Sequence, residues 1–278
     1  MPAPWHIYET ILRPIYVSLR RLVTDILFEW PMGTQTSREV SLEELGLAAE
    51  GREKYRPSGW LNLRRILPIE QVSENDVFID FGSGKGRVIY QAARYPFKRV
   101  IGVELSEELN AIARKNIQGS IDRFCCKNVE LITSDVLVYE IPDDITVVYL
   151  FNPFTGSIFR TLLEKLIASI ERNPRIVRIV YADPVEESVL LAAGARELRR
   201  TFGMRPSLEL IRRSSTVLYA LGPNASQRPA RPRCSPQQVL FGLLSRSNAD
   251  SRVQPLRTSS ENTAHDGAGV NVAAPLSL

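Results

Sequence analysis

The sequence predicts an α/β fold in which helices cover both faces of a mostly parallel sheet. From Val77 onward, short apolar runs alternate with amphipathic segments of helical periodicity. This alternation is typical of a parallel sheet, because each crossover helix covers one face. A glycine-rich turn after the first run is the second observation, since such turns lead into helices whose N-termini face ligands.

The composition narrows the class of protein. The chain has 278 residues, a net charge of +4 and 44% hydrophobic residues, which suits a globular protein with a core and demands no acidic partner. Three cysteines without framework spacing favour a reducing compartment, so we expect a cytoplasmic protein. The two histidines, His6 and His265, lie near the ends of the chain, and we expect neither a metal site nor a histidine triad. No apolar run is long enough to cross a membrane, and no secretory leader is evident.

Residues 1–56 are expected to form a helical extension or lid. Between residues 7 and 30, apolar side chains recur on one helical face, namely Tyr8, Leu12, Ile15, Leu19, Leu22, Ile26 and Trp30. This face either packs on the body of the domain or lies, as a basic amphipathic helix, on a membrane surface. Pro14 marks the first turn or a kink. Ser41 is expected to cap a short helix that begins there.

The strands and helices that follow can be assigned in order. A short helix is expected near residues 61–67, before the first strand. Strands are expected at 77–81, 99–104, 129–132, 146–151, 176–181, 197–202 and 216–221. Helices are expected at 86–95, after Ser106, at 158–170 and at 185–193. We expect residues 57–222 to form one domain, and residues 223–278, rich in Pro, Ser, Ala and Asn, to be a disordered tail.

The glycine turn has the spacing G-x-G-x-G, with Gly82, Gly84 and Gly86. It matches neither the dinucleotide fingerprint nor the P-loop. Glycines at this spacing let the backbone pass close to a ligand. We expect Lys85 and Arg87 to be solvated at the start of the helix.

An acidic residue stands at the end of each of three consecutive strands. They are Asp80, Glu104 and Asp135, and such strand ends form the ligand site of open α/β sheets. Glu104 can accept hydrogen bonds from a ribose diol, and Asp135 can accept one from an adenine amino group. Asp80 either holds the turn or meets a ligand ammonium. Each acid alone would read as a loop carboxylate or helix cap, but three together favour a binding site.

These motifs resemble the class I S-adenosylmethionine-dependent methyltransferases over residues 57–222. Tyr55-Arg56-Pro57-Ser58 before the glycine turn further resembles the branch of the Dot1-type histone lysine methyltransferases and their small bacterial relatives. The resemblance implies a Rossmann-like, seven-stranded sheet with an antiparallel last strand, and S-adenosylmethionine as cofactor. The cofactor-binding residues expected on this basis are Tyr55, Asp80, Gly82, Ser83, Gly84, Gly86, Glu104, Leu105, Asp135, Val136 and Asn152.

Asn152-Pro153-Phe154 follows the fourth strand and gives the candidate catalytic residues. Amino-group methyltransferases of this superfamily often carry an Asn/Asp-Pro-Pro-aromatic motif here, which holds the target nitrogen. This chain has a single proline, so its register departs by one residue. The alternative is a simple Asn-Pro turn. No general base is identifiable, since the chemistry mainly requires alignment and exclusion of water.

The sequence therefore predicts a methyltransferase. Its acceptor is expected to be a protein lysine or a small-molecule nitrogen. Nucleic acid is not expected, because no basic stripe with interleaved aromatic residues is evident. The alternative is a non-catalytic protein that binds S-adenosylmethionine or a nucleotide and recruits a partner through its tail.

Overall fold

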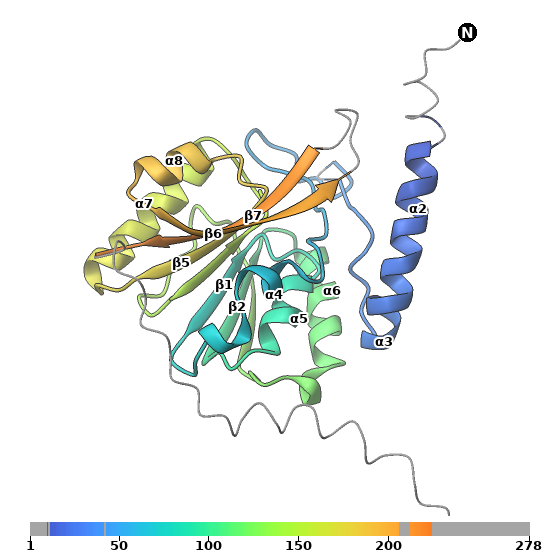
Figure 1. Cartoon of the computed structure of the whole chain (residues 1–278), viewed down its shortest axis with the longest axis horizontal. Helices are drawn as coiled ribbons and strands as arrows, with labels where there is room; N and C mark the ends of the chain where they lie inside the picture. Colours follow the sequence, from blue (N-terminus) through green and yellow to red (C-terminus); the bar gives the residue numbers. More distant parts are fainter. Residues whose placement is uncertain (1–9, 11, 42, 206–211, 224–278) are drawn as a thin grey trace, which may run out of the picture. The chain divides into compact units, whose positions relative to one another are not determined.

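The core is a seven-stranded sheet, as predicted. The computed structural model describes residues 10, 12–41, 43–205 and 212–223; Tyr8 and the expected tail from residue 224 lie outside them. The strand order is β3-β2-β1-β4-β5-β7-β6, and β7 is antiparallel to β5 and to β6 (Figure 1). The strands are β1 Val77–Phe81, β2 Arg99–Glu104, β3 Val129–Thr133, β4 Val147–Leu150, β5 Val177–Ala182, β6 Arg196–Arg205 and β7 Arg212–Leu221.

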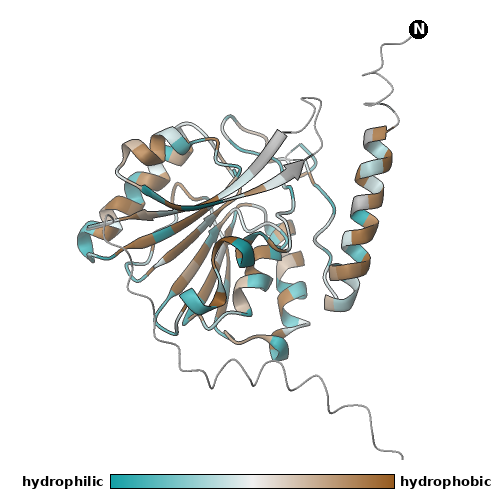
Figure 2. Cartoon of the chain, viewed as in Figure 1, coloured by the Kyte–Doolittle hydropathy of each residue, from teal (hydrophilic) through white to brown (hydrophobic). Residues whose placement is uncertain are grey.

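Helices cover the two faces of the sheet and create two separate cores. One face carries α4 Asn62–Ile66, α5 Arg87–Ala93 and α6 Glu107–Gln118, and the other carries α7 Ser157–Arg172 and α8 Glu187–Ala192. Short 3-10 segments, η3 Ile69–Gln71 and η4 Ile121–Arg123, complete the connections. Because side chains alternate along a strand, β1 serves both cores. Val77, Ile79 and Phe81 pack toward α7, whereas Phe78 packs toward α4 and α5. The strands are accordingly apolar along most of their length (Figure 2).

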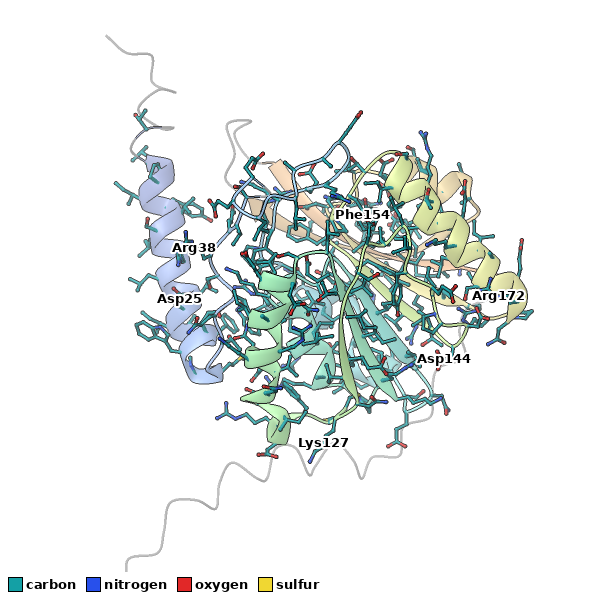
Figure 3. The ribbon with its side chains drawn as sticks, turned by 180° about the vertical axis from the view of Figure 1, so that it is seen from behind. Asp25, Arg38, Lys127, Asp144, Phe154 and Arg172 are labelled. Carbon is teal, nitrogen blue, oxygen red and sulfur yellow. The ribbon has the colours of Figure 1, made fainter. Side chains whose placement is uncertain are left out.

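The register of the parallel strands determines where a ligand can bind. Phe81 at the end of β1 pairs with Val103 of β2 and with Leu150 of β4. Glu104 pairs with Thr133 at the end of β3. The segments that leave these strands therefore meet at one edge of the sheet. Figure 3 shows Phe154 at this end, with Lys127 and Asp144 at the opposite end.

Two boundaries differ from the sequence-based expectation. The hairpin of β6 and β7 is longer than expected. Its ladder continues through polar positions, such as the pair formed by Arg205 and Arg212, where the sequence shows no alternation of apolar and polar residues. Residues 43–46 form a turn instead of a helix. The Ser41 hydroxyl still accepts a hydrogen bond from the Glu44 N–H, at 3.2 Å. The Ser106 cap is confirmed, since its hydroxyl accepts from the Leu109 N–H.

The N-terminal helix forms as expected, but its apolar face does not pack on the body of the domain. It consists of α2 Arg13–Thr24, a π-helical turn η2 Asp25–Glu29 and α3 Trp30–Met32, with Pro14 in the first turn of α2. The predicted apolar residues Leu12, Ile15, Leu19, Leu22, Ile26 and Trp30 are 46–69% exposed. None of the described helices is both long and apolar enough to span a membrane.

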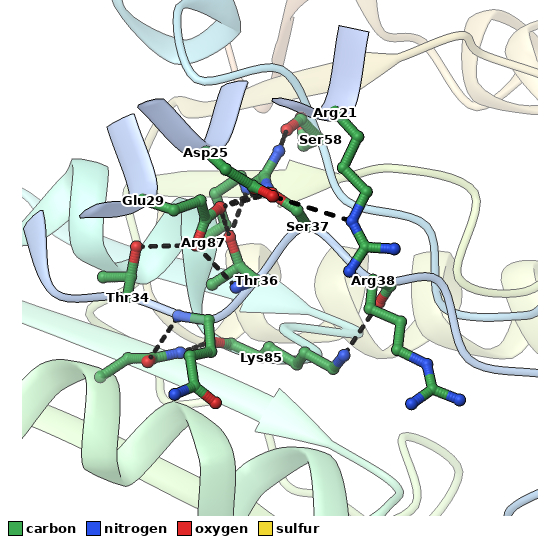
Figure 4. A network of polar contacts seen from close by, with 12 residues as sticks. Arg21, Asp25, Glu29, Thr34, Thr36, Ser37, Arg38, Ser58, Lys85 and Arg87 are labelled. Carbon is green, nitrogen blue, oxygen red and sulfur yellow. Dashed lines mark hydrogen bonds and ion pairs between the residues drawn. The ribbon is translucent and has the colours of Figure 1, made fainter. Parts of the chain in front are cut away.

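A buried ion pair joins the end of this helix to the glycine turn (Figure 4). Arg87 Nη2 lies 2.6 Å from Glu29 Oε1, and the two residues are 5% and 3% exposed. Thr36 donates to both carboxylate oxygens of Glu29, through its hydroxyl and its backbone N–H. The Trp60 ring lies 5.1 Å from the guanidinium carbon of Arg87.

Lys85 and Arg87 are thus not solvated, and that expectation is wrong. Lys85 is 5% exposed and donates to the Arg38 carbonyl at 2.9 Å. Arg87 also donates to the Ser58 carbonyl, at 2.8 Å. Both side chains bind the N-terminal segment, whose position a local pattern cannot reveal.

We expect Glu29→Gln to lower the free energy of unfolding by about 3–5 kcal/mol, because it leaves the Arg87 charge buried and unpaired. Burial raises the pKa of Glu29, but the hydrogen bonds from Thr36 and the charge of Arg87 outweigh it and hold the pKa below its ordinary 4.5. The contribution of the carboxylate is therefore complete above about pH 4.5 and is lost as the pH falls through the lower pKa of the folded state.

Urea unfolding at neutral and acidic pH measures both effects. Asp25→Asn is the control, because its contact with Arg21 is 3.8 Å long and partly exposed, and such pairs contribute at most about 1 kcal/mol. Equal losses for the two variants would contradict the assignment.

Candidate functional site

A cleft opens at the carboxyl ends of β1 to β4. Its empty space, open mouth included, is about 770 Å³. The core contributes Phe81, Gly82, Val103, Glu104, Leu105, Ser134, Asp135, Val136, Phe151, Pro153, Phe154 and Ile158. Residues 52–56 of the N-terminal segment line the other side. We call residues 51–56 the strap.

The glycine turn is tightly packed against the strap and against the exit of β4. Gly84 has a φ of 55°, and a Cβ there would lie 2.2 Å from the Tyr55 ring. Gly82 has a φ of 76°, and a Cβ there would lie 2.3 Å from Pro153 Cβ. Both conformation and space therefore require glycine at these two positions.

Glu104 holds the glycine turn through its carboxylate. One oxygen accepts from the Gly84 N–H at 2.7 Å, and the other accepts from the Ser106 N–H at 2.9 Å. Burial raises the pKa of Glu104, and these backbone hydrogen bonds oppose that rise. Asp80 is 3% exposed, and burial together with the charge of Glu104 raises its pKa well above the ordinary value. Two buried acids at one site favour a ligand that brings positive charge and hydroxyl groups.

The strap crosses the cleft as an extended segment. Arg52 forms an antiparallel bridge with Phe154, and the Glu53 N–H donates to the Pro153 carbonyl at 3.1 Å. Arg52 Nη2 lies 2.8 Å from Asp135 Oδ2, with both side chains about a quarter exposed. Arg52 of the strap is thus paired with Asp135, the acid that follows the third strand.

Tyr55 fixes the other end of the strap. Its hydroxyl donates to the Thr36 carbonyl at 2.9 Å, and its backbone bridges Val40. The ammonium of Lys85 lies 5.2 Å from the centre of its ring. Burial raises the pKa of the Tyr55 hydroxyl, so it stays protonated as a hydrogen-bond donor.

Asn152 forms hydrogen bonds with the loop that follows β5 and does not line the cleft. Its amide nitrogen donates to the Asp183 carbonyl at 2.6 Å, and its oxygen accepts from the Val185 N–H at 3.4 Å. Its φ is 43°, and that of Asp183 is 50°, so both residues adopt the left-handed conformation. Asn152 is 5% exposed. In this structure it therefore has the geometry of the turn-forming alternative.

The structure brings eight of the expected site residues to the cleft wall. They are Tyr55, Gly82, Glu104, Leu105, Asp135, Val136, Pro153 and Phe154. Asp80, Ser83, Gly84, Gly86 and Asn152 are not among the lining residues; Gly86 caps α5, and the Ser83 hydroxyl is buried without a partner among the described residues. The lining residues that the sequence did not indicate include Arg52, Glu53, Lys54, Arg56, Phe151 and Ile158. Most belong to the strap, which has no periodicity. The described residues include no cluster of three His, Cys, Asp or Glu side chains suited to a metal ion.

Comparisons with known proteins point to one superfamily. Residues 61–184 match the family model described as histone methylation protein DOT1. The chain is 31% identical over 136 residues to the H3 lysine-79-specific histone-lysine N-methyltransferase of Drosophila melanogaster, covering 45% of this chain and 7% of that one. It is 38% identical over 65 residues to a protein-lysine N-methyltransferase of Saccharolobus islandicus (strain REY15A), covering 23% of this chain and 40% of that one. The chain thus spans less than half the length of either relative.

Solved structures show weaker likenesses. An RNA methyltransferase of Salinibacter ruber in complex with S-adenosyl-L-homocysteine is 24% identical, with 62% of this chain and 96% of that one covered and a TM-score of 0.43. A SAM-dependent methyltransferase of Aquifex aeolicus is 15% identical, with 57% and 92% covered and a TM-score of 0.42. We draw the assignment from the family match, the strand order and the glycine turn instead. On these grounds, the core of this chain is similar to the class I S-adenosylmethionine-dependent methyltransferases.

Proposed function

We propose that this protein transfers a methyl group from S-adenosylmethionine to a lysine side chain of a protein. The observation that carries the proposal is the pair of buried carboxyl groups, Asp80 and Glu104, behind a glycine turn at the edge of the sheet. The two protein-lysine methyltransferases among the relatives support the choice of acceptor.

The carboxyl groups at the cleft suit this cofactor as hydrogen-bond acceptors. Glu104 would accept from the ribose hydroxyls, Asp135 from the adenine amino group, and Asp80 would face the ammonium of the methionine part. Leu105 and Val136 offer apolar surface beside the two acids. When bound, S-adenosylmethionine supplies a methyl group that is already electrophilic on its sulfonium.

The chain itself must orient the acceptor and exclude water. Phe151, Pro153, Phe154 and Ile158 give the cleft an apolar wall, where desolvation lowers the pKa of an incoming ammonium and favours the neutral amine. The neutral amine would then take the methyl group that the bound cofactor supplies, the sulfonium would leave as a neutral thioether, and the proton lost by the methylated amine would pass to water. Glu53 in the strap also lines the cleft, and its charge complements a cationic acceptor.

The proposed location of the reaction is the cytoplasm. Cys125 and Cys126 are both free thiols, which suits a reducing compartment.

Calorimetric titration should show saturable binding of S-adenosylmethionine and of S-adenosylhomocysteine. With labelled methyl donor and a cell lysate, we expect label in a product that protease destroys and nuclease does not. Folded protein that binds neither compound would contradict the cofactor. Binding without transfer would favour the non-catalytic regulator, and label in small molecules would change the class of acceptor.

We expect Glu104→Gln to weaken S-adenosylmethionine binding by roughly tenfold or more, because hydrogen bonds to a charged acceptor are lost. Glu104 has a raised pKa in the free protein, and the cationic ligand favours its ionised form. The affinity of the wild type should therefore rise with pH until the pH exceeds the raised pKa of Glu104 in the free protein, and the variant should show a shallower rise. Calorimetry across mildly acidic to neutral pH measures both the loss of affinity and the dependence of the affinity on pH. Glu108→Gln, an exposed change of the same charge on α6, is the control and should leave the affinity unchanged.

We expect Arg52→Gln to tighten S-adenosylmethionine binding by up to about fivefold. Asp135 must release Arg52 before it can accept from an adenine, and a partly exposed ion pair contributes at most about 1 kcal/mol. Lys98→Gln removes one charge from an exposed pair with Asp144, at the opposite end of the sheet, and serves as the control. Weaker binding by the Arg52 variant would show that Arg52 itself holds the ligand.

A further inference from the structure

The N-terminal helix carries a continuous apolar surface that the core does not cover. Between residues 12 and 30, ten apolar side chains are 40–69% exposed, and we call all of them except Val17 the apolar face: Leu12, Ile15, Tyr16, Leu19, Leu22, Val23, Ile26, Leu27 and Trp30. Figure 2 shows brown, hydrophobic stretches recurring along α2. Contiguous apolar surface of this kind marks an interaction site.

The width of the apolar face narrows what can cover it. At about 100° per residue, the six members between Leu12 and Val23 fall within an arc of about 120°. Val17 is exposed outside that arc. A two-stranded coiled coil needs only two positions in seven, a narrower stripe than this one. A broad apolar arc beside a polar side that carries Arg21 is typical of a helix lying in a membrane interface.

The attachment of the helix leaves this face free. Phe28 stacks on Trp60, with ring centres 5.7 Å apart and planes 8° apart. Glu29 binds Arg87 in the buried ion pair. Neither residue belongs to the apolar face. The core therefore holds the helix at its C-terminal end through other side chains.

The charges favour an anionic lipid surface over a second copy of the chain. Residues 12–27 contain Arg13, Arg20 and Arg21 against the single acid Asp25. Two such helices packed together would bring like charges close, whereas anionic headgroups would complement them. Tyr16 and Trp30 are amphipathic residues of the kind that lies at membrane interfaces.

We propose that the apolar face of residues 12–30 docks the protein on an anionic membrane surface. The helix lies in the plane of the interface and does not span it, in keeping with the lack of a described helix apolar enough to cross. This proposal is independent of methyl transfer, since no residue of the apolar face lines the cleft.

Co-sedimentation of the full chain with lipid vesicles tests the proposal. Vesicles of phosphatidylcholine with a third of phosphatidylglycerol should bind the protein, and vesicles of phosphatidylcholine alone should bind it less well. Leu19→Gln should weaken binding to the mixed vesicles by roughly tenfold or more, because one buried leucine is lost. Ser18→Gln, on the polar side of the same turn, is the matched control and should stay within about twofold.

Other outcomes would overturn the proposal. They are absence of binding to both kinds of vesicle, or equal binding by the Leu19 variant and the wild type. A dimer in light scattering that Leu19→Gln dissociates, without vesicle binding, would assign the face to a second copy. Thermal unfolding checks that both variants are folded, which we expect because both side chains are exposed.

Discussion

The ion pair between Glu29 and Arg87 is the interaction on which the arrangement of the cleft depends. A buried pair is tolerated only when hydrogen bonds satisfy its remaining atoms, and Thr36 and Ser58 supply them here. Arg87 is the first residue of α5 and follows the glycine turn directly. The pair therefore fixes the N-terminal segment against the element that forms the floor of the cleft. Tyr55 continues this attachment, since its hydroxyl donates to the Thr36 carbonyl while its ring covers Gly84.

The two ends of the strap are held with unequal strength. At one end, Tyr55 is partly buried and donates to the carbonyl of Thr36, whose hydroxyl accepts from Arg87. At the other end, Arg52 and Asp135 are about a quarter exposed, and such a pair contributes at most about 1 kcal/mol. Separating Arg52 from Asp135 thus costs much less than separating Arg87 from Glu29. A ligand that competes for Asp135 needs to displace only the weakly held end, and the glycine turn keeps its shape meanwhile.

The sequence predicted the elements whose causes are local. The strands, the Ser106 cap and the glycine turn each depend on residues within a few positions, and the observed strand bounds agree closely except in the longer hairpin of β6 and β7. Long-range contacts were not predictable in this way. Arg87 appeared to start an exposed helix because its partner lies 58 residues earlier. The amide of Asn152 is engaged by the loop after β5, 31 residues later. The strap has neither period nor motif beyond Tyr55, so Arg52 gave no signal. For the N-terminal helix, periodicity predicted the apolar face but not its exposure.

In the proposed function, Glu104 links the stability of the glycine turn to the binding of a ligand. In the free protein its two oxygens accept from the Gly84 and Ser106 N–H groups, which offsets part of the cost of burying a carboxylate. Each carboxylate oxygen has two lone pairs, so these bonds leave further acceptor capacity toward the cleft that Glu104 lines. A ligand hydroxyl can therefore be bound without releasing the turn. Asp80 lies in the same buried region with its pKa raised, and a cationic ligand group would relieve the repulsion between the two acids. In the proposed function, these two carboxyl groups would therefore provide selectivity for a ligand that carries both hydroxyl groups and a positive charge.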